Sequence, residues 1–308
     1  MLRHWVAKHF LSFFATCLLL IILFQGSVLA QEGGSTQSVF LPLVFKPYHY
    51  SFFVAGHTYG RPGVDNPGVH PPFKDHFPFI KASGTGFGIF TGDIVDYGTA
   101  ADWCEIDADI AELGIPVHFV VGNHDMTDRN LFVDRYGPTY YSFRHAGDLF
   151  IVLDGELDHC HINGDQLIFL QGALESDPLP NTVFIFVHKL IWVVEKTPYY
   201  PLINKVNGIG GYDFESNFWT DVAPLLYALD VPVYIVAGDV GTSRAMPLFW
   251  NVDKNIHFVA SGMGGNVEEN FLLFDVVGSK VSIEAYRLDN QPLRLGAVEA
   301  YNLAHYFP

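Results

Sequence analysis

The stretches FGIFTGDIVD, residues 87–96, and PVHFVVGNHD, residues 116–125, decide how this chain folds. Each begins with a short apolar run that is closed by a glycine, and such runs predict buried β-strands. Residues 99–113 between them carry apolar side chains at helical spacing, with Thr99 and Asp102 arranged as a capping box. A strand, a helix and a strand in succession predict an α/β sheet.

Polar residues recur where the predicted strands end. Three further apolar runs stop at Gly, His or Asp: residues 50–55 before Gly56-His57, residues 182–187 before His188, and residues 231–237 before Gly238-Asp239. The ligand crevice of an α/β sheet lies outside the carboxyl ends of its strands, so these side chains are expected to converge there. Because Asp, Asn and His are metal-ligand types, the pattern predicts a metal site at this edge.

The remaining periodicity predicts the rest of the architecture. Helices are expected over residues 165–174 and 218–229, and two adjacent strands over residues 140–143 and 149–153. Strands then follow one another without a long helix, at residues 247–252, 256–260, 271–277 and 281–286. Alternating elements followed by a strand meander predict an α/β core with a second, partly antiparallel sheet.

The first residues have the features of a secretory signal peptide. Arg3 and Lys8 precede an apolar run over residues 10–24, and small residues end the segment before Gln31. The run is shorter than the roughly 20 residues that span a bilayer comfortably. We therefore expect a secreted or extracytoplasmic protein, while a membrane anchor formed by residues 10–24 stays the alternative.

The domain boundaries follow from this leader. Residues 31–38 consist of Gly, Ser, Thr and Gln with one Glu, which is typical of a flexible linker. The expected division is a signal peptide or anchor over residues 1–30, a linker over residues 31–47 and one domain over residues 48–308.

The chain is strongly acidic. Its formal net charge is −16, and loss of Arg3 and Lys8 with the leader would bring it to −18. Such a surface repels nucleic acids and anionic membranes, so we expect no nucleic-acid partner and no membrane contact beyond the leader. Whether Cys104 and Cys160 pair stays open, as does the oligomeric state.

In combination, the motifs GDIVD at residues 92–96 and GNHD at residues 122–125 resemble those of calcineurin-like metallophosphoesterases. His188 followed by Trp192 fits the same family, as does the stretch PTYYSF at residues 138–143. The resemblance implies a four-layer α/β/β/α sandwich with two mixed sheets. It also implies a divalent-metal site and hydrolysis of phosphate esters.

The resemblance further implies a set of metal ligands. In the family, the aspartate at the position of Asp93 bridges two ions. One of these ions would also be held by Asn123, His188 and Asp239, the last standing where a histidine is usual. Two carboxylates, an amide oxygen and one imidazole favour Mn²⁺, Mg²⁺ or Fe²⁺.

The second ion of the family has lost its ligands here. Three of the corresponding positions are Gly56, Thr58 and Gly241, and none of these side chains binds a metal well. His57 is a weak substitute that rests only on its place at a strand end. We therefore expect a single ion, or none that is held tightly.

The resemblance assigns the chemistry as well. A water activated by the ion would attack phosphorus, and His124 would donate a proton to the leaving oxygen. Asp96 or Asp125 would orient the His124 ring. The expected substrate is a small phosphorylated compound, and monoester, diester and nucleotide all stay open.

Each assignment has a plainer alternative. Asp93 and Asp96 could cap the following turn and helix, His188 could be an ordinary buried histidine, and Asp239 a turn residue. The missing ligands favour a catalytically inactive protein that uses the scaffold for binding. The retained GNHD motif favours an enzyme.

Overall fold

The computed structural model describes residues 48–308, apart from residue 62 and residues 64–65, 209–211, 243–245, 266–267 and 290–293. The leader expected over residues 1–30 and the linker expected over residues 31–47 lie outside the described residues. Within the described part of the chain, no helix has the length and apolar character needed to cross a membrane.

The first sheet combines both ends of the domain. Its strand order is β12-β11-β10-β1-β2-β3, in which β1, β2 and β3 run parallel and β10, β11 and β12 are antiparallel to their neighbours. The strands are β1 (His49–Ala55), β2 (Phe87–Thr91), β3 (Val117–Val120), β10 (Asn270–Val277), β11 (Lys280–Arg287) and β12 (Arg294–Ala297).

The second sheet is built from the middle of the chain. Its order is β4-β5-β6-β7-β9-β8, with β5, β6, β7 and β9 parallel and β4 and β8 antiparallel at the two edges. The strands are β4 (Tyr141–His145), β5 (Asp148–Val152), β6 (Val183–Val187), β7 (Val233–Ala237), β8 (Leu248–Asp253) and β9 (Ile256–Ser261). Both sheets are therefore mixed.

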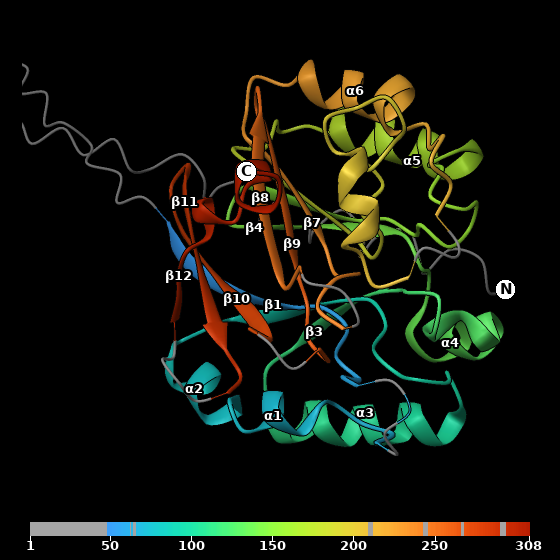
Figure 1. Ribbon diagram of the computed structural model, residues 1–308, viewed down its shortest axis with the longest axis vertical. Coiled ribbons are helices and arrows are strands. Elements are labelled where there is room, and N and C mark those ends of the chain that lie inside the picture. Colours follow the sequence, from blue (N-terminus) through green and yellow to red (C-terminus); the bar gives the residue numbers. More distant parts are fainter. Residues whose placement is uncertain are drawn as a thin grey trace, which may run out of the picture. The chain divides into compact units, whose positions relative to one another are not determined.

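Helices cover the outer face of each sheet (Figure 1). Against the first sheet pack α1 (Pro71–Lys74), α2 (Phe77–Ala82), α3 (Ala100–Leu113) and α4 (Arg129–Tyr136); against the second pack α5 (Gly164–Leu174) and α6 (Ala223–Tyr227). Short helical turns complete the chain: η1 (Asp125–Asp128), η2 (Tyr200–Asn204), η3 (Phe218–Val222), η4 (Val298–Ala300) and α7 (Leu303–Tyr306). The predicted four-layer α/β/β/α sandwich is confirmed.

The layers explain why the central strands are apolar on both faces. Along β1, Phe52 and Val54 join the core between the two sheets, whereas Phe53 and Ala55 join the core beneath the helices. Both faces of the strand are buried, so alternation with polar residues is absent. Phe52 stacks on Phe274 of its own sheet, with ring centroids 4.7 Å apart, and meets Phe184 of the other sheet edge-on at 5.3 Å.

Two features differ from the sequence-based expectation. The strand meander does not form one sheet, because β8 and β9 join the second sheet while β10 and β11 join the first. The helix expected over residues 218–229 is split into a π-helical turn, Phe218–Val222, and the short α6. Pro224 lacks the N–H that an α-helix donates to the carbonyl four residues earlier, so regular geometry begins only at Ala223.

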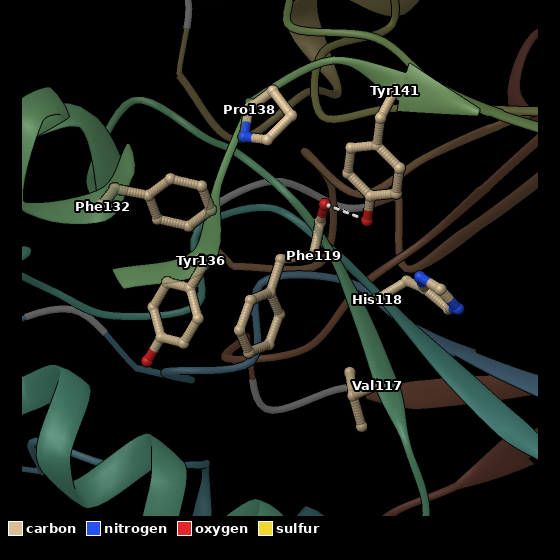
Figure 2. Close-up of a pocket in the computed structure, with 7 residues that line it drawn as sticks. All are labelled: Val117, His118, Phe119, Phe132, Tyr136, Pro138 and Tyr141. Atoms are coloured by element: carbon tan, nitrogen blue, oxygen red, sulfur yellow. Dashed lines mark hydrogen bonds between the residues drawn. The ribbon is translucent and has the colours of Figure 1, made fainter. Parts of the chain in front are cut away.

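The edges of the two sheets meet at β3 and β4. The Tyr141 hydroxyl on β4 donates to the backbone carbonyl of Phe119 on β3 at 3.1 Å (Figure 2). The His118 ring stacks on Phe143 with centroids 3.9 Å apart. A cavity of about 380 Å³ at this seam is lined by Val117, His118, Phe119, Phe132, Tyr136, Pro138 and Tyr141. No residue of the predicted metal site lines it.

Candidate metal centre

The end of β2 in the first sheet contacts the ends of β6 and β7 in the second sheet. Asp93 follows β2 of the first sheet, and His188 and Asp239 follow β6 and β7 of the second. Nδ1 of His188 lies 2.9 Å from the carbonyl oxygen of Thr91, across the junction between the sheets. The backbone N–H groups of Gly238 and Asp239 both donate to the His188 carbonyl, at 2.9 and 3.0 Å.

Three predicted ligands form a buried cluster. Nε2 of His188 lies 3.3 Å from Oδ1 of Asp93 and 3.8 Å from Oδ1 of Asp239. One ligand atom from each of the three residues lies within 4.8 Å of the others. Asp93 and Asp239 are each 3% exposed and His188 is fully buried, so the cluster is held away from bulk water.

The hydrogen bonds of His188 show which of its two ring nitrogens faces the carboxylates. A carbonyl oxygen only accepts, so Nδ1 carries the proton that is donated to Thr91. Nε2 is buried without a hydrogen-bond partner and faces two carboxylates. Burial alone would lower the pKa of His188, but Asp93 and Asp239 outweigh it and raise the pKa to about 10. The arrangement fits a cation, either a proton on Nε2 or a metal ion.

Glycines allow the two motif loops to close around Asp93. A Cβ on Gly92 would lie 2.3 Å from Nδ1 of His188, and a Cβ on Gly122 would lie 2.3 Å from Oδ1 of Asp93. Asp93 itself has a φ of +50°, a strained conformation for a residue with a side chain. The glycines of both motifs therefore make room for the site.

The carboxylate of Asp93 stays ionised. Burial acts to raise its pKa, but the nearby His188, with smaller contributions from His57 and His124, lowers the pKa below the ordinary range. Asp239 differs, because burial and the charge of Asp93 raise its pKa to about 6.

His124 is oriented by Asp96. Its Nδ1 lies 2.8 Å from the Asp96 backbone oxygen and 3.4 Å from Oδ1 of the same residue. The backbone N–H of His124 donates to Oδ1 of Asp93 at 3.1 Å, which fixes the loop next to the cluster. The Tyr59 ring packs against the His124 ring with centroids 5.1 Å apart.

Asp125 contacts the backbone instead of His124. Its Oδ1 accepts from the N–H groups of Ile94 and Val95, at 2.8 and 3.1 Å, and its Oδ2 accepts from Gly122 at 2.8 Å. Burial and the charge of Asp93 raise the pKa of Asp125 to about 7, while the backbone donors act in the opposite direction. Of the two residues expected to orient His124, the structure therefore places Asp96 at the ring and uses Asp125 to join the two motif loops.

The two remaining predicted ligands lie beside the cluster. Nε2 of His57 is 3.5 Å from Oδ2 of Asp93. Burial lowers the pKa of His57 to about 4, so its ring is neutral and offers a lone pair. Asn123 lies between Gly122 and His124 and is exposed.

Backbone atoms pack closely against Gly56 and Gly241, two of the positions that the resemblance assigns to a second ion. A Cβ on Gly56 would lie 2.2 Å from the carbonyl oxygen of Ser261, and a Cβ on Gly241 would lie 2.5 Å from the carbonyl carbon of Gly262. Met263 donates its N–H to the Gly56 carbonyl at 3.2 Å. The end of β9 and the loop after it therefore pack directly on Gly56 and Gly241.

One neighbour of the cluster, Tyr212, belongs to no motif of the sequence. Tyr212 donates its hydroxyl to Oδ2 of Asp239 at 2.8 Å. It belongs to the segment between β6 and η3, which carries aromatic residues, glycines and prolines without periodicity. Burial, followed by the charge of Asp239, raises the pKa of Tyr212 well above its ordinary value, so the hydroxyl keeps its proton.

The fold and these motifs place the chain in one class. The sequence model of the calcineurin-like phosphoesterase family matches residues 49–238, so the chain belongs to this family. A search of curated proteins finds no match.

Two solved structures illustrate the fold. One is a dimetal phosphatase from Danio rerio, with a TM-score of 0.57 and 12% identity over 78% of this chain and 96% of that chain. The other is the purple acid phosphatase PPD1 from seeds of yellow lupin, Lupinus luteus, with a TM-score of 0.57 and 12% identity over 80% of this chain and 53% of that chain. At this level of identity the similarity establishes the fold.

Proposed function

We propose that this protein is a metal-dependent phosphoesterase that works with a single divalent ion and hydrolyses a small phosphorylated compound. The observation that carries the proposal is Nε2 of His188, which is buried without a hydrogen-bond partner and faces the carboxylates of Asp93 and Asp239. Asp93, His188 and Asp239 would hold the ion, with Asn123 and His57 as further ligands. This mainly oxygen-based set favours Mn²⁺, Mg²⁺ or Fe²⁺.

The residues around the cluster have defined tasks in this reaction. When bound, the ion supplies positive charge for the phosphoryl oxygens and activates water. Asp96 holds the His124 ring through Nδ1, so that Nε2 is available to deliver a proton to the leaving oxygen. Asp125 keeps the loops that carry Asp93 and His124 at a fixed separation.

A second candidate function is supported by a different observation. Backbone atoms pack closely against Gly56 and Gly241, which speaks against side-chain ligands for a second ion at these two positions. A protein that binds phosphorylated ligands without hydrolysing them would tolerate this loss.

Metal analysis and a phosphatase assay distinguish the two functions. We expect purified protein to bind about one Mn²⁺ per chain and to hydrolyse p-nitrophenyl phosphate slowly. Asp93→Asn should abolish both binding and turnover, whereas Asp134→Asn, which changes an exposed carboxylate on α4, should leave them unchanged. Absence of turnover, with or without bound metal, overturns the phosphoesterase and supports the binding protein.

We also propose that the protein is exported. Support comes from the basic residues, apolar run and small-residue exit within residues 1–30. Expression of the full chain should yield protein outside the cytoplasm whose N-terminus begins near Gln31. Protein that keeps its N-terminus and stays with membranes would instead indicate an anchor formed by residues 10–24.

A further inference from the structure

Asp239 stands where the family resemblance places a histidine, and the two side chains differ as ligands. An imidazole ring offers a metal one nitrogen in a fixed direction. A carboxylate offers two oxygens and binds through one or both of them. A carboxylate at this position therefore needs an additional contact to present a single defined ligand atom.

Tyr212 makes this contact. Its hydroxyl lies 2.8 Å from Oδ2 of Asp239, while Oδ1 of Asp239 is the atom that faces Nε2 of His188 at 3.8 Å. The backbone N–H of Leu190 points at the Tyr212 oxygen from 3.4 Å. Since that N–H is a donor, the tyrosine proton is directed to Asp239.

The Tyr212 ring is itself held in place. The ammonium group of Lys189 lies 5.8 Å from the ring centroid, within the range of a cation–π contact. Lys189 is 2% exposed and forms an ion pair of 2.7 Å with Glu156. Leu190 and Lys189 directly follow His188, so Tyr212 connects the loop of one ligand to the side chain of another.

We propose that Tyr212 is a positioning residue that occupies one oxygen of Asp239 and thereby makes Asp239 a one-oxygen ligand of the ion. Tyr212 and Asp239 together then replace the single histidine that is usual in the family. This inference rests on the proposed metal site. Outer contacts of this kind commonly change metal affinity by about 10- to 100-fold.

The first test is Tyr212→Phe, which removes only the hydroxyl. Mn²⁺ affinity measured by calorimetry should weaken by about tenfold or more, and the electron paramagnetic resonance spectrum of bound Mn²⁺ should change. The matched control is Tyr227→Phe, which also breaks a tyrosine–aspartate hydrogen bond, that of 2.6 Å to Asp253. The control should leave affinity and spectrum unchanged.

The second test separates positioning from a general structural role. In an Asp239→His background the ligand offers one atom without help, so adding Tyr212→Phe should cost less than twofold in Mn²⁺ affinity. An equal loss in both backgrounds would assign Tyr212 a structural role and overturn the inference. If Tyr212→Phe does not fold, the smaller Tyr212→Leu substitution, which also lacks a hydrogen-bond donor, should show the same loss.

The outcomes also distinguish this inference from the proposed function. If the unmodified protein binds no Mn²⁺, the metal site and the role of Tyr212 both fail. If the unmodified protein and Tyr212→Phe bind Mn²⁺ equally well and give the same spectrum, only the role of Tyr212 fails.

Discussion

At the scale of single residues, Gly56 differs most from the pattern that the family resemblance implies. The position would carry a metal-binding aspartate, but a Cβ there would meet the Ser261 carbonyl oxygen at 2.2 Å and the Gly238 Cα at 2.7 Å. Both neighbours are backbone atoms, which cannot turn away as a side chain would. The path of the chain therefore opposes a side-chain ligand at this position, in addition to the absence of the ligand itself.

This geometry predicts that the family ligand cannot be restored by substitution. Gly56→Asp should destabilise the fold by about 3 kcal/mol or more and should not raise the stoichiometry above one Mn²⁺ per chain. Chemical denaturation and metal analysis check the two parts.

A matched pair of smaller changes provides the control. Gly56→Ala should also destabilise, whereas Gly172→Ala adds a Cβ inside α5, with no atom within 4 Å, and should stabilise by about 0.5–1 kcal/mol. A stable Gly56→Asp protein that binds two ions would contradict the closed second site.

The sequence identified the residues at the cluster because each stands directly after an apolar strand. Asp93, His188 and Asp239 follow β2, β6 and β7. The last two strands are parallel neighbours in the second sheet, and the contact between His188 and Thr91 brings them to the end of β2 in the first sheet. Tyr212 could not be found in this way, since its segment has no periodicity and its partner is 27 residues away. Likewise, the partners of Asp125 are backbone groups, which no residue pattern reveals.

At the scale of elements, the seam between β3 and β4 closes one side of the sandwich. Each of these strands is the edge of its sheet, and an uncovered edge exposes unpaired backbone groups. The Tyr141 hydroxyl satisfies the Phe119 carbonyl at 3.1 Å, and Figure 2 shows the two residues facing each other at the cavity. The stretch PTYYSF therefore has a structural role, because its residue Tyr141 links the edges of the two sheets.

We expect Tyr141→Phe to lower the free energy of unfolding by about 1 kcal/mol, the usual net contribution of such a hydrogen bond. Tyr140→Phe is the control, because the Tyr140 hydroxyl makes no hydrogen bond within the described part of the chain. Equal urea midpoints for Tyr141→Phe and the unmodified protein would show that water replaces the bond without cost.

The same seam makes stability depend on pH. Burial lowers the pKa of His118, whose ring stacks on Phe143. The unfolded chain, with an ordinary histidine pKa of about 6.5, then binds a proton more readily than the folded chain. The contribution of His118 is therefore complete above about pH 6.5 and is lost as the pH falls below it.

Urea denaturation at several pH values checks this prediction. His118→Phe keeps a ring on Phe143 but removes the titrating group, so its stability should fall less between pH 7 and pH 5 than that of the unmodified protein. Burial also lowers the pKa values of His57 and His257, so these two residues should keep part of the dependence of stability on pH. A slope that His118→Phe leaves unchanged would assign the acid sensitivity to other groups.

At the scale of the whole domain, the proposed ion would join the two sheets. Asp93 belongs to the first sheet, and His188 and Asp239 to the second, so a single ion would be shared between them. An ion that binds only the folded chain stabilises it by about 2.7 kcal/mol when present at 100 times its dissociation constant. Mn²⁺ should therefore raise the melting temperature of the entire domain in one cooperative transition. Asp93→Asn should remove this increase, and a melting temperature that rises equally in Asp93→Asn would mean that Mn²⁺ acts elsewhere on the acidic surface.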